Sequence, residues 1–234
     1  MLSEIMLQQT QVSRVIPKFD SFLRAFPDVS SLASAPLADV LILWSGLGYN
    51  RRAKYLWLAA QQIVNDFSGQ VPTTIQDLVR LPGIGHNTAG AILAYAYNEP
   101  VIFIETNIRT VYIHHFFPVG DKVSDQQLTP WLAQTVPPDN ARTWYWALMD
   151  YGAHLKQTIG NISRASSTYS KQSKFEGSKR QIRGQILRAL ASGPHSLTSL
   201  IEVVADERLL DVLHDLQQEQ LIQKNGHSYY LYMV

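Results

Sequence analysis

The 234-residue sequence contains no cysteine, which excludes disulfide bonds, thiolate zinc sites and cysteine-ligated iron–sulfur clusters. Long apolar runs are also missing. The stretch at residues 89–96 is interrupted by Gly90 and is far shorter than the roughly 20 residues that a membrane-spanning helix needs. No charged-then-apolar leader opens the chain. These absences predict a cytoplasmic protein.

Net charge is low as well, at +1, while 46% of the residues are hydrophobic, as is ordinary for a soluble globular protein with one large or two small domains. The charge is unevenly distributed, because residues 156–183 hold seven basic residues and a single acid, Glu176. Such a run is usually a solvated face or a linker. Beside a nucleic-acid-binding motif it would be a strip that contacts phosphates.

Convincing strand patterns are scarce in the first two hundred residues, which are typical of helices with short breaks. In the first helix Ile5, Val12 and Ile16 begin an apolar stripe that continues through Phe19 and Leu23. Trp144 to Met149 in a late helix are assigned to the core. The expected helices span residues 4–25, 30–35, 37–44, 51–67, 75–80, 107–117, 124–134 and 140–155.

The composition and the predicted secondary structure change near the end of the chain. Residues 160–177 are polar and Ser-rich, and predict a linker or an ordered DNA-facing loop. Helices at 178–191, 196–204 and 207–220 and a hairpin of 221–224 with 228–232 then predict a winged helix. The third helix is acidic, which is unfavourable for reading a DNA major groove. We expect a protein contact or a packing role for it. Its charged residues are Glu207, Asp211, Asp215 and Glu219 against Arg208.

The stretch LPGIGHNTAG at residues 81–90 predicts two helices joined by a hairpin. Glycines at the junction let a ligand approach the backbone, and the free amides at the start of the next helix form an anion site that suits a DNA phosphate. Taken alone, such a motif is more often an ordinary glycine turn between buried helices.

Three motifs together resemble a known family. They are SEIMLQQTQV at residues 3–12, LWSGLGY at 43–49, and LPGIGHNTAG followed by Glu105 and Asn107. In this order and spacing, over residues 2–155, they resemble the helix-hairpin-helix (HhH-GPD) DNA glycosylases of base excision repair, and in particular the adenine-specific, MutY-type branch. The resemblance implies an all-α, two-lobed fold that binds double-stranded DNA containing a mismatch, in the nucleoid.

The resemblance also implies a domain division. A six-helix-barrel-type lobe would span residues 1–102, with the hairpin at 81–90, and a second helical lobe without an iron–sulfur cluster would span 103–160. A basic linker (161–177) and a winged-helix-like domain (178–234) complete the chain. The family commonly carries four cluster cysteines, and the corresponding positions here are Lys156, Ser163, Ser166 and Gln172. We therefore expect no cofactor and no metal, and a DNA-facing role for the basic residues of this loop.

Releasing a purine requires a proton for the departing base and negative charge beside an oxocarbenium-like sugar. By the resemblance, Glu4 is the general acid, and burial among apolar neighbours would raise its pKa. Glu105 stands where the family has Asp, and Asn107 orients that carboxylate. A structural ion pair of Glu105 with Arg109 is the alternative.

The resemblance assigns DNA contacts to Gln9 and Tyr49, which match residues that enter the duplex, and to the hairpin. Asn87 replaces the Lys of bifunctional members, which predicts a monofunctional enzyme. The further expected DNA contacts are Arg51, Arg52, Gly83, Gly85, His86, Asn87, Thr88, Lys171, Lys174 and Lys179.

The expected activity is monofunctional excision of a mispaired base, most simply adenine opposite guanine or 8-oxoguanine. Two alternatives stay open. The longer acid at Glu105 and Thr106 in place of the usual Gly are compatible with a glycosylase for another base, or with a lesion-binding protein of weak activity.

Overall fold

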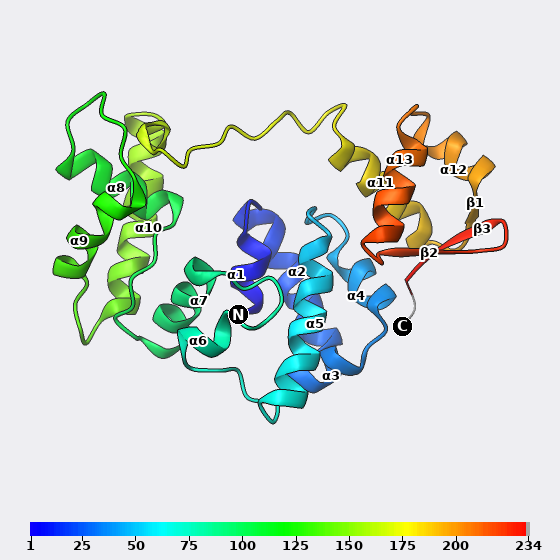
Figure 1. The fold of residues 1–234 in the computed structure, drawn as a ribbon, viewed down its shortest axis with the longest axis horizontal. Coiled ribbons are helices and arrows are strands. Elements are labelled where there is room, and N and C mark those ends of the chain that lie inside the picture. Colours follow the sequence, from blue (N-terminus) through cyan, green and yellow to red (C-terminus); the bar gives the residue numbers. More distant parts are fainter. Residues whose placement is uncertain (233–234) are drawn as a thin grey trace. The chain divides into compact units, whose positions relative to one another are not determined.

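The computed structural model describes residues 1–232 and is mostly helical, with one small sheet (Figure 1). Contacts divide it into two compact units. The N-terminal unit comprises residues 2–72, 81–83 and the chain from 173 onward, and the central unit comprises Met1 with residues 73–80 and 84–172. The division thus falls at the hairpin, whereas the sequence placed a boundary at residue 102. Among the described residues, no helix has the length and apolarity needed to cross a membrane.

The first helices of the N-terminal unit are α1 (Leu2–Leu7), α2 (Val12–Ala25), α3 (Val29–Ser34), α4 (Leu37–Trp44) and α5 (Arg51–Asp66). Helix α4 has the predicted bounds, because Pro36 precedes its first turn and the glycines after Trp44 end it. An Asp28–Ser31 capping box starts α3. Their buried side chains, Met6, Phe22, Leu37, Trp44, Leu56 and Ile63 among them, form the core.

The single helix predicted at residues 4–25 is wrong, because the chain breaks between α1 and α2, with Gln9 in a left-handed conformation at φ 54°. The break changes which side chains are buried. Val12 and Ile16 of the predicted stripe are 60% and 58% exposed, and Val15 and Phe22 are buried instead. The break thus shifts the apolar face of α2 away from the stripe predicted for one continuous helix.

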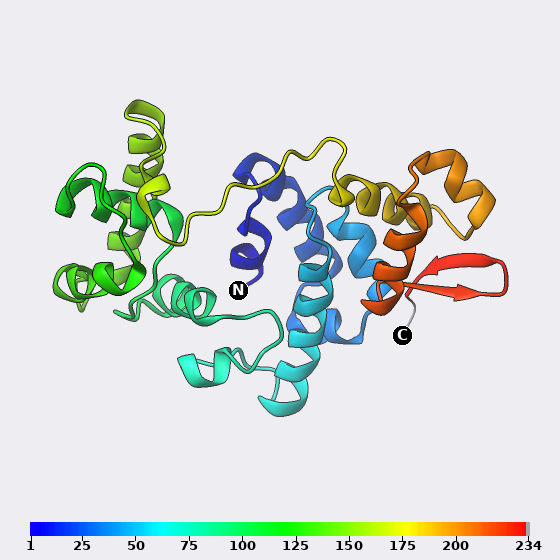
Figure 2. The same ribbon diagram turned by 45° about the horizontal axis from the view of Figure 1, so that its top comes forward.

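The end of the chain forms the predicted winged helix. It consists of α11 (Lys179–Ala191), β1 (His195–Ser196), α12 (Leu197–Val204), α13 (Leu209–Gln218), β2 (Ile222–Asn225) and β3 (Ser228–Leu231). Its antiparallel sheet has the order β1-β3-β2, with Ile222 opposite Leu231, and β1 is a short strand that the sequence did not predict. Figure 2 shows the β2–β3 hairpin extending from α13. Helix α11 and strand β3 pack on α4.

The acidic helix α13 faces basic residues of its own unit. Glu219 pairs with Arg183 and also lies 3.4 Å from the Arg51 Nε, while Lys54 Nζ donates to the Glu219 carbonyl at 2.7 Å. Lys179 pairs with Asp215 at 3.5 Å. The contacts of Glu219, the C-cap of α13, with Arg51 and Lys54 therefore dock the winged helix on α5, while the pairs with Arg183 and Lys179 join α13 to α11 within the winged helix.

The central unit is built from α6 (Ile75–Leu78), α7 (His86–Ile92), the π-helix η1 (Leu93–Tyr97), α8 (Thr106–Phe116), α9 (Asp125–Thr135), α10 (Ala141–Thr158) and the 3-10 helix η2 (Ile162–Ala165). Its core is aromatic and aliphatic and includes Phe103, Ile108, Tyr112 and Tyr145. Burial raises the pKa of Tyr145, whose hydroxyl donates to the Val101 carbonyl. Trp146, which the sequence assigned to the core, is 53% exposed.

Part of the segment predicted as a linker or an ordered loop is folded into the central unit. Helix η2 packs on α8, and residues around Ser166 bridge to Val123 through hydrogen bonds from Val123 N to the Ala165 carbonyl and from Ser167 N to the Val123 carbonyl, each 2.9 Å. Residues 161–172 thus belong to the central unit.

Candidate active site and DNA-contacting surface

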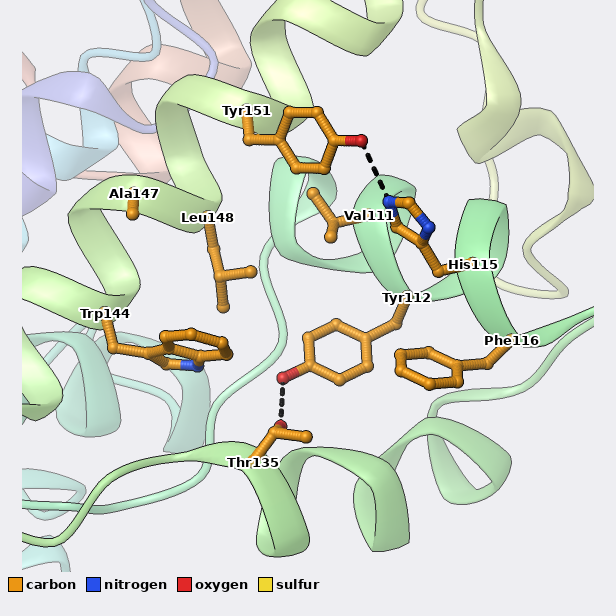
Figure 3. Close-up of a pocket in the computed structure, with 9 residues that line it drawn as sticks. All are labelled: Val111, Tyr112, His115, Phe116, Thr135, Trp144, Ala147, Leu148 and Tyr151. Carbon is orange, nitrogen blue, oxygen red and sulfur yellow. Dashed lines mark hydrogen bonds between the residues drawn. The ribbon is translucent and has the colours of Figure 1, made fainter.

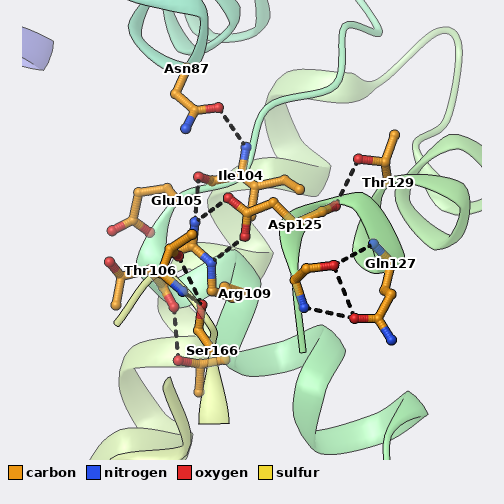
Figure 4. A network of polar contacts seen from close by, with 12 residues as sticks. Asn87, Ile104, Glu105, Thr106, Arg109, Asp125, Gln127, Thr129 and Ser166 are labelled. Carbon is orange, nitrogen blue, oxygen red and sulfur yellow. Dashed lines mark hydrogen bonds and ion pairs between the residues drawn. The ribbon is translucent and has the colours of Figure 1, made fainter. Parts of the chain in front are cut away.

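Glu105 is the N-cap of α8 (Figure 4). Its Oε2 accepts a hydrogen bond from the Asn107 backbone N–H at 2.6 Å, which satisfies one of the free amides of the first turn. The alternative ion pair with Arg109 is not what forms, because that guanidinium binds Asp125 through two bonds of 2.7 and 2.8 Å. Glu105 is half-buried at this position.

Asn87 connects the hairpin helix to the segment that carries Glu105. Its Oδ1 accepts a hydrogen bond from the Ile104 N–H at 3.2 Å, and the two residues lie on α7 and directly before the acid (Figure 4). The amide thus fixes the backbone one residue before Glu105. The sequence predicts Asn87 only as a DNA contact at the position where bifunctional members have Lys. No local pattern predicts its hydrogen bond with Ile104, 17 residues away.

Gly152 lets α10 approach the start of α8 closely. A Cβ built on Gly152 would lie 2.3 Å from the carbonyl oxygen of Asn107 and 2.7 Å from its Cβ. Contacts that short are not tolerated, so only glycine fits here. Gly90 plays the same part under Phe103, where an added Cβ would lie 2.7 Å from the Phe103 Cβ. The backbone around Glu105 is therefore held by packing from two helices.

Glu4 lies in the first turn of α1, beside the buried Ile5 and Met6. The far end of this short helix is held by Arg52, whose Nη1 donates to the carbonyls of Ile5 at 2.6 Å and Met6 at 3.0 Å. Carbonyls at a helix C-terminus lack partners within the helix, and a cation there also complements the helix dipole. Arg52 thus stabilises the helix that carries the predicted acid.

Arg52 was expected to contact DNA, but its terminal nitrogens bind within the protein. Besides α1, its Nη2 donates to Thr10 Oγ1 at 3.0 Å and to the Leu47 and Gly48 carbonyls at 3.3 and 3.2 Å. Burial lowers the pKa of the guanidinium to about 10, so it stays charged at neutral pH. In this geometry Arg52 holds the end of α1 and the turns at Thr10 and Gly48.

The same guanidinium joins two turns that carry the residues expected to enter the duplex. Gln9 and Tyr49 both have left-handed backbones, with φ values of 54° and 47°. Their turns are tied by the Thr10 Oγ1 bond to the Leu47 carbonyl at 3.3 Å, as well as by Arg52. The structure thus brings together two sites that lie forty residues apart in the sequence.

The two hairpin glycines differ in what they allow. Gly83 has φ +77°, and an added Cβ would lie 2.8 Å from the Tyr55 Cβ, so this glycine is required by the turn and by its packing. At Gly85 an added Cβ would meet nothing within 4 Å. The space over Gly85, followed by the exposed His86 and Asn87 and the half-buried Thr88 at the start of α7, fits the close backbone approach expected of a phosphate.

The basic residues expected to face DNA fall into two groups. Lys171 and Lys174 are exposed, while Lys179 pairs with Asp215 at 3.5 Å and Arg51 lies beside Glu219 although it is 60% exposed. Of these four residues, only Lys171 and Lys174 are therefore exposed without an ion pair to an acid.

The positions that match the family's cluster cysteines do not suit an iron–sulfur cluster. Ser163 and Ser166 are each 3% exposed, and their hydroxyls are bonded to neighbouring side chains, Ser163 to Asn161 at 2.5 Å and Ser166 to Thr168 at 2.9 Å. Serine hydroxyls are not thiolate ligands. No group of three or more His, Asp or Glu side chains in residues 1–232 is placed to hold a metal ion.

A pocket of about 470 Å³ lies in the central unit between α8, the end of α9 and α10 (Figure 3). It is lined by apolar and aromatic groups, and the His115 ring bonds the Tyr151 hydroxyl at 2.9 Å at its edge. The residues predicted for catalysis do not line it. Its lining is Val111, Tyr112, His115, Phe116, Thr135, Trp144, Ala147, Leu148 and Tyr151.

Known proteins resemble this chain in sequence and fold. It is 37% identical over 153 residues to the adenine DNA glycosylase of Buchnera aphidicola subsp. Baizongia pistaciae, covering 65% of this chain and 44% of that protein. It is 33% identical over 215 residues to the adenine DNA glycosylase of Mycolicibacterium smegmatis, covering 85% of this chain and 73% of that one. The chain spans less than half the length of the Buchnera relatives.

Among solved structures, a thermostable thymine-DNA glycosylase superposes with a TM-score of 0.60 at 24% identity, over 65% of this chain and 71% of that one. A trapped endonuclease III–DNA covalent intermediate superposes with a TM-score of 0.55 at 18% identity, over 65% and 70%. These two establish the fold. Residues 2–134 match the family described as HhH-GPD superfamily base excision DNA repair protein. Together with the Mycolicibacterium match, this shows that the chain belongs to the HhH-GPD superfamily of base excision DNA repair proteins.

Proposed function

We propose that this protein is a monofunctional DNA glycosylase that releases adenine mispaired with guanine or 8-oxoguanine. The observation that carries the proposal is the hydrogen bond from the Ile104 N–H to Asn87, which couples the hairpin helix to the backbone that holds Glu105. A phosphate bound at the hairpin would thereby fix the sugar relative to an acid. Adenine is proposed as the released base because the Buchnera and Mycolicibacterium relatives are adenine DNA glycosylases.

In the proposed reaction Glu4 donates a proton to the adenine as the bond between the base and C1′ breaks. The electron pair of that bond leaves with the base, and positive charge develops on the sugar. The ionised carboxylate of Glu105 stabilises that charge. Water then adds to C1′ as the hydroxyl, and its second proton returns to the Glu4 carboxylate. The base must leave the helical stack first, with Gln9 and Tyr49 filling the space that it vacates.

Glu105 bears on this proposal because its carboxylate reaches about one bond further than the family's Asp. The capping bond from the Asn107 N–H draws the carboxylate of this longer side chain toward the first turn of its own helix, which supports the proposal. In the proposal this brings the free oxygen back toward the place an Asp would occupy.

Single-turnover assays on duplexes that each hold one mispair test the proposal. Release of adenine opposite guanine or 8-oxoguanine supports it, release of another base replaces adenine with that base, and tight binding without release makes the chain a lesion-binding protein. A Glu105→Asp variant is assayed in parallel. If it releases the base faster than the unmodified protein, Glu105 supports the reaction less well than the Asp that the family carries at this position.

The monofunctional part of the proposal has its own test. Asn87 has no amine to form a Schiff base with the sugar, so borohydride reduction should trap no covalent adduct with DNA that carries an abasic site. An Asn87→Lys variant is the matched positive control, because it restores the amine at the same position. A trapped adduct with the unmodified protein would refute monofunctional chemistry.

We further propose that the outward face of the winged helix contacts a protein and not DNA. Ile201, Val203 and Leu210 are 53%, 48% and 60% exposed there, and the exposed Glu207 and Asp211 add negative charge. Negative charge disfavours a phosphate backbone. Replacing Glu207 and Asp211 with amides should leave the affinity for duplex DNA within twofold, and a marked gain in DNA affinity would contradict this assignment, because removing negative charge beside a phosphate backbone tightens binding.

A further inference from the structure

The ring of Tyr49 lies against two guanidinium groups. The Arg52 Cζ is 5.4 Å from the ring centroid and the Arg180 Cζ is 5.7 Å from it, both within the range of a cation–π contact. Arg180 Nη1 also donates a hydrogen bond to the Tyr49 hydroxyl at 3.0 Å. Arg180 belongs to α11 of the winged helix, so this contact joins residues 131 apart in the sequence.

Both arginines are themselves fixed by the backbone. Arg52 is held by the carbonyls at the end of α1 and in the turn before Tyr49. Arg180 Nη2 donates to the Ser173 carbonyl at 2.6 Å and lies 3.5 Å from the Lys174 carbonyl. These two anchored guanidinium groups therefore contact the Tyr49 ring, and one of them also binds its hydroxyl.

Arg180 also lies at the meeting point of two elements expected to touch DNA. One of its nitrogens binds the hydroxyl of Tyr49 and the other binds the loop that carries the exposed Lys174. Helix α11 is seated in turn by the Arg183 pair with Glu219 and by its contact with α4. The position of the winged helix thus fixes Arg180, and Arg180 in turn contacts Tyr49.

We infer that Arg180 is a positioning residue for Tyr49, by which the winged helix orders the aromatic side chain before it enters the duplex. This inference rests on the proposed function, in which Tyr49 fills the space left by the extruded base. Tyr49 has a left-handed backbone after Gly48, a conformation that non-glycine residues keep only when their surroundings hold them. Ordering the ring in the free protein removes a cost that binding would otherwise carry.

The decisive experiment is a double-mutant cycle on binding. Affinity for a duplex with an adenine–guanine mispair is measured by fluorescence anisotropy for the unmodified protein, Arg180→Ala, Tyr49→Ala and the double variant. Arg180→Ala should weaken binding by about 2- to 12-fold, the range for losing the order of one side chain. In the Tyr49→Ala background the same change should have no effect, because Arg180 acts through the ring.

The salt dependence separates positioning from direct contact with DNA. An arginine that binds a phosphate lowers the slope of log affinity against log salt by about one when it is removed, whereas a positioning residue leaves that slope unchanged. Arg188→Ala is the matched control, because Arg188 is an exposed arginine on the same helix.

Arg180→Lys provides a second measurement if the alanine variant is less stable. Lysine keeps the charge but loses the planar fork, so it should give a smaller loss that also vanishes without Tyr49. The inference is overturned if the Arg180 effect persists in the Tyr49→Ala background, if the salt slope falls by about one, or if removing Arg180 tightens binding. Failure of the proposed function is distinguishable, because an inactive unmodified protein still yields the full binding cycle.

Discussion

The two acids of the proposed reaction each lie at the start of a helix, yet the two helices are fixed by different forces. Helix α8 is held sterically, with Gly152 and Gly90 admitting close contacts around Glu105 and Asn107. Helix α1 has six residues and is held at its far end by the hydrogen bonds of Arg52. The first arrangement tolerates no added volume, and the second depends on the shape of one guanidinium.

This difference matters because a six-residue helix is not stable by its own hydrogen bonds. Helix α1 therefore depends on tertiary partners for its position, whereas α8 has eleven residues and a side-chain cap from Glu105. We expect the position of Glu105 to be sensitive to packing within its unit, and the position of Glu4 to be sensitive to loss of hydrogen-bond donors within its own unit.

The largest expected effect comes from removing the proton donor. Glu4→Gln should lower the single-turnover rate of adenine release by about 10² to 10⁴-fold while mispair affinity stays close to that of the unmodified protein. Rate and affinity are measured on the same labelled duplex. Glu99→Gln, an exposed acid of the central unit, is the control. A Glu4→Gln protein with an unchanged rate would remove Glu4 from the mechanism and leave Glu105 as the one catalytic acid.

A packing change should act next most strongly, on the Glu105 side alone. Gly152→Ala places a methyl group against the Asn107 carbonyl, which should cost about 1–3 kcal/mol of folding free energy and displace the start of α8. A displacement of roughly 1 Å can lower the rate by on the order of a hundredfold. Urea unfolding and the single-turnover rate measure both effects.

Gly184→Ala is the matched control for this packing effect. Gly184 is also within a helix, but its added Cβ would meet only the end of the Arg188 side chain, at 3.4 Å. There the gain in helix propensity, about 0.5–1 kcal/mol, should leave stability equal or higher. Equal losses in the two variants would mean that helix propensity, and not the contact with Asn107, sets the cost at Gly152.

The contrast between the two helices also shows how far the sequence could predict this structure. Residues that act within a few positions of a helix end allow its bounds to be predicted from the sequence. Examples are Pro36 and the glycines after Trp44 at the ends of α4, and the Thr74 cap at the start of α6. The break between α1 and α2 has no proline or glycine to mark it. It depends on Thr10 and on Arg52 from another helix, and a periodicity count over residues 4–25 cannot detect such a partner.

The site residues divide in the same way. The motifs located Glu4, Glu105 and Tyr49 as candidates, but not the groups that hold them. Arg52 lies in a basic run that indicates a phosphate contact, and only its burial in the fold, which the sequence does not encode locally, turns it inward. Arg180 likewise counted toward a DNA-facing charge until the fold placed it against Tyr49.

A donor change on the Glu4 side should have a moderate effect. Arg52→Lys keeps the charge but loses the fork that reaches Ile5, Met6 and Thr10 at once. Hydrogen bonds to charged groups contribute about 1.5–3 kcal/mol, so we expect a loss of that order in urea unfolding and a lower rate of release. Arg24→Lys, at an exposed arginine of α2, should change neither. If Arg52→Lys is as stable and active as the unmodified protein, α1 is held by its apolar contacts and the contrast with α8 disappears.

The smallest expected effects lie in the basic segment, which passes from one unit to the other. Lys171 belongs to the unit of Glu105, and Lys174 and Lys179 belong to the unit of Tyr49. Each of the exposed Lys171→Gln and Lys174→Gln should lower the salt slope of DNA binding by about one, if both units contact phosphates. Lys179→Gln should lower it less, because that ammonium already pairs with Asp215. If only Lys174→Gln changes the salt slope, only the unit of Tyr49 contacts the DNA backbone at this segment. If no variant changes the slope, the segment is not part of the DNA-binding surface.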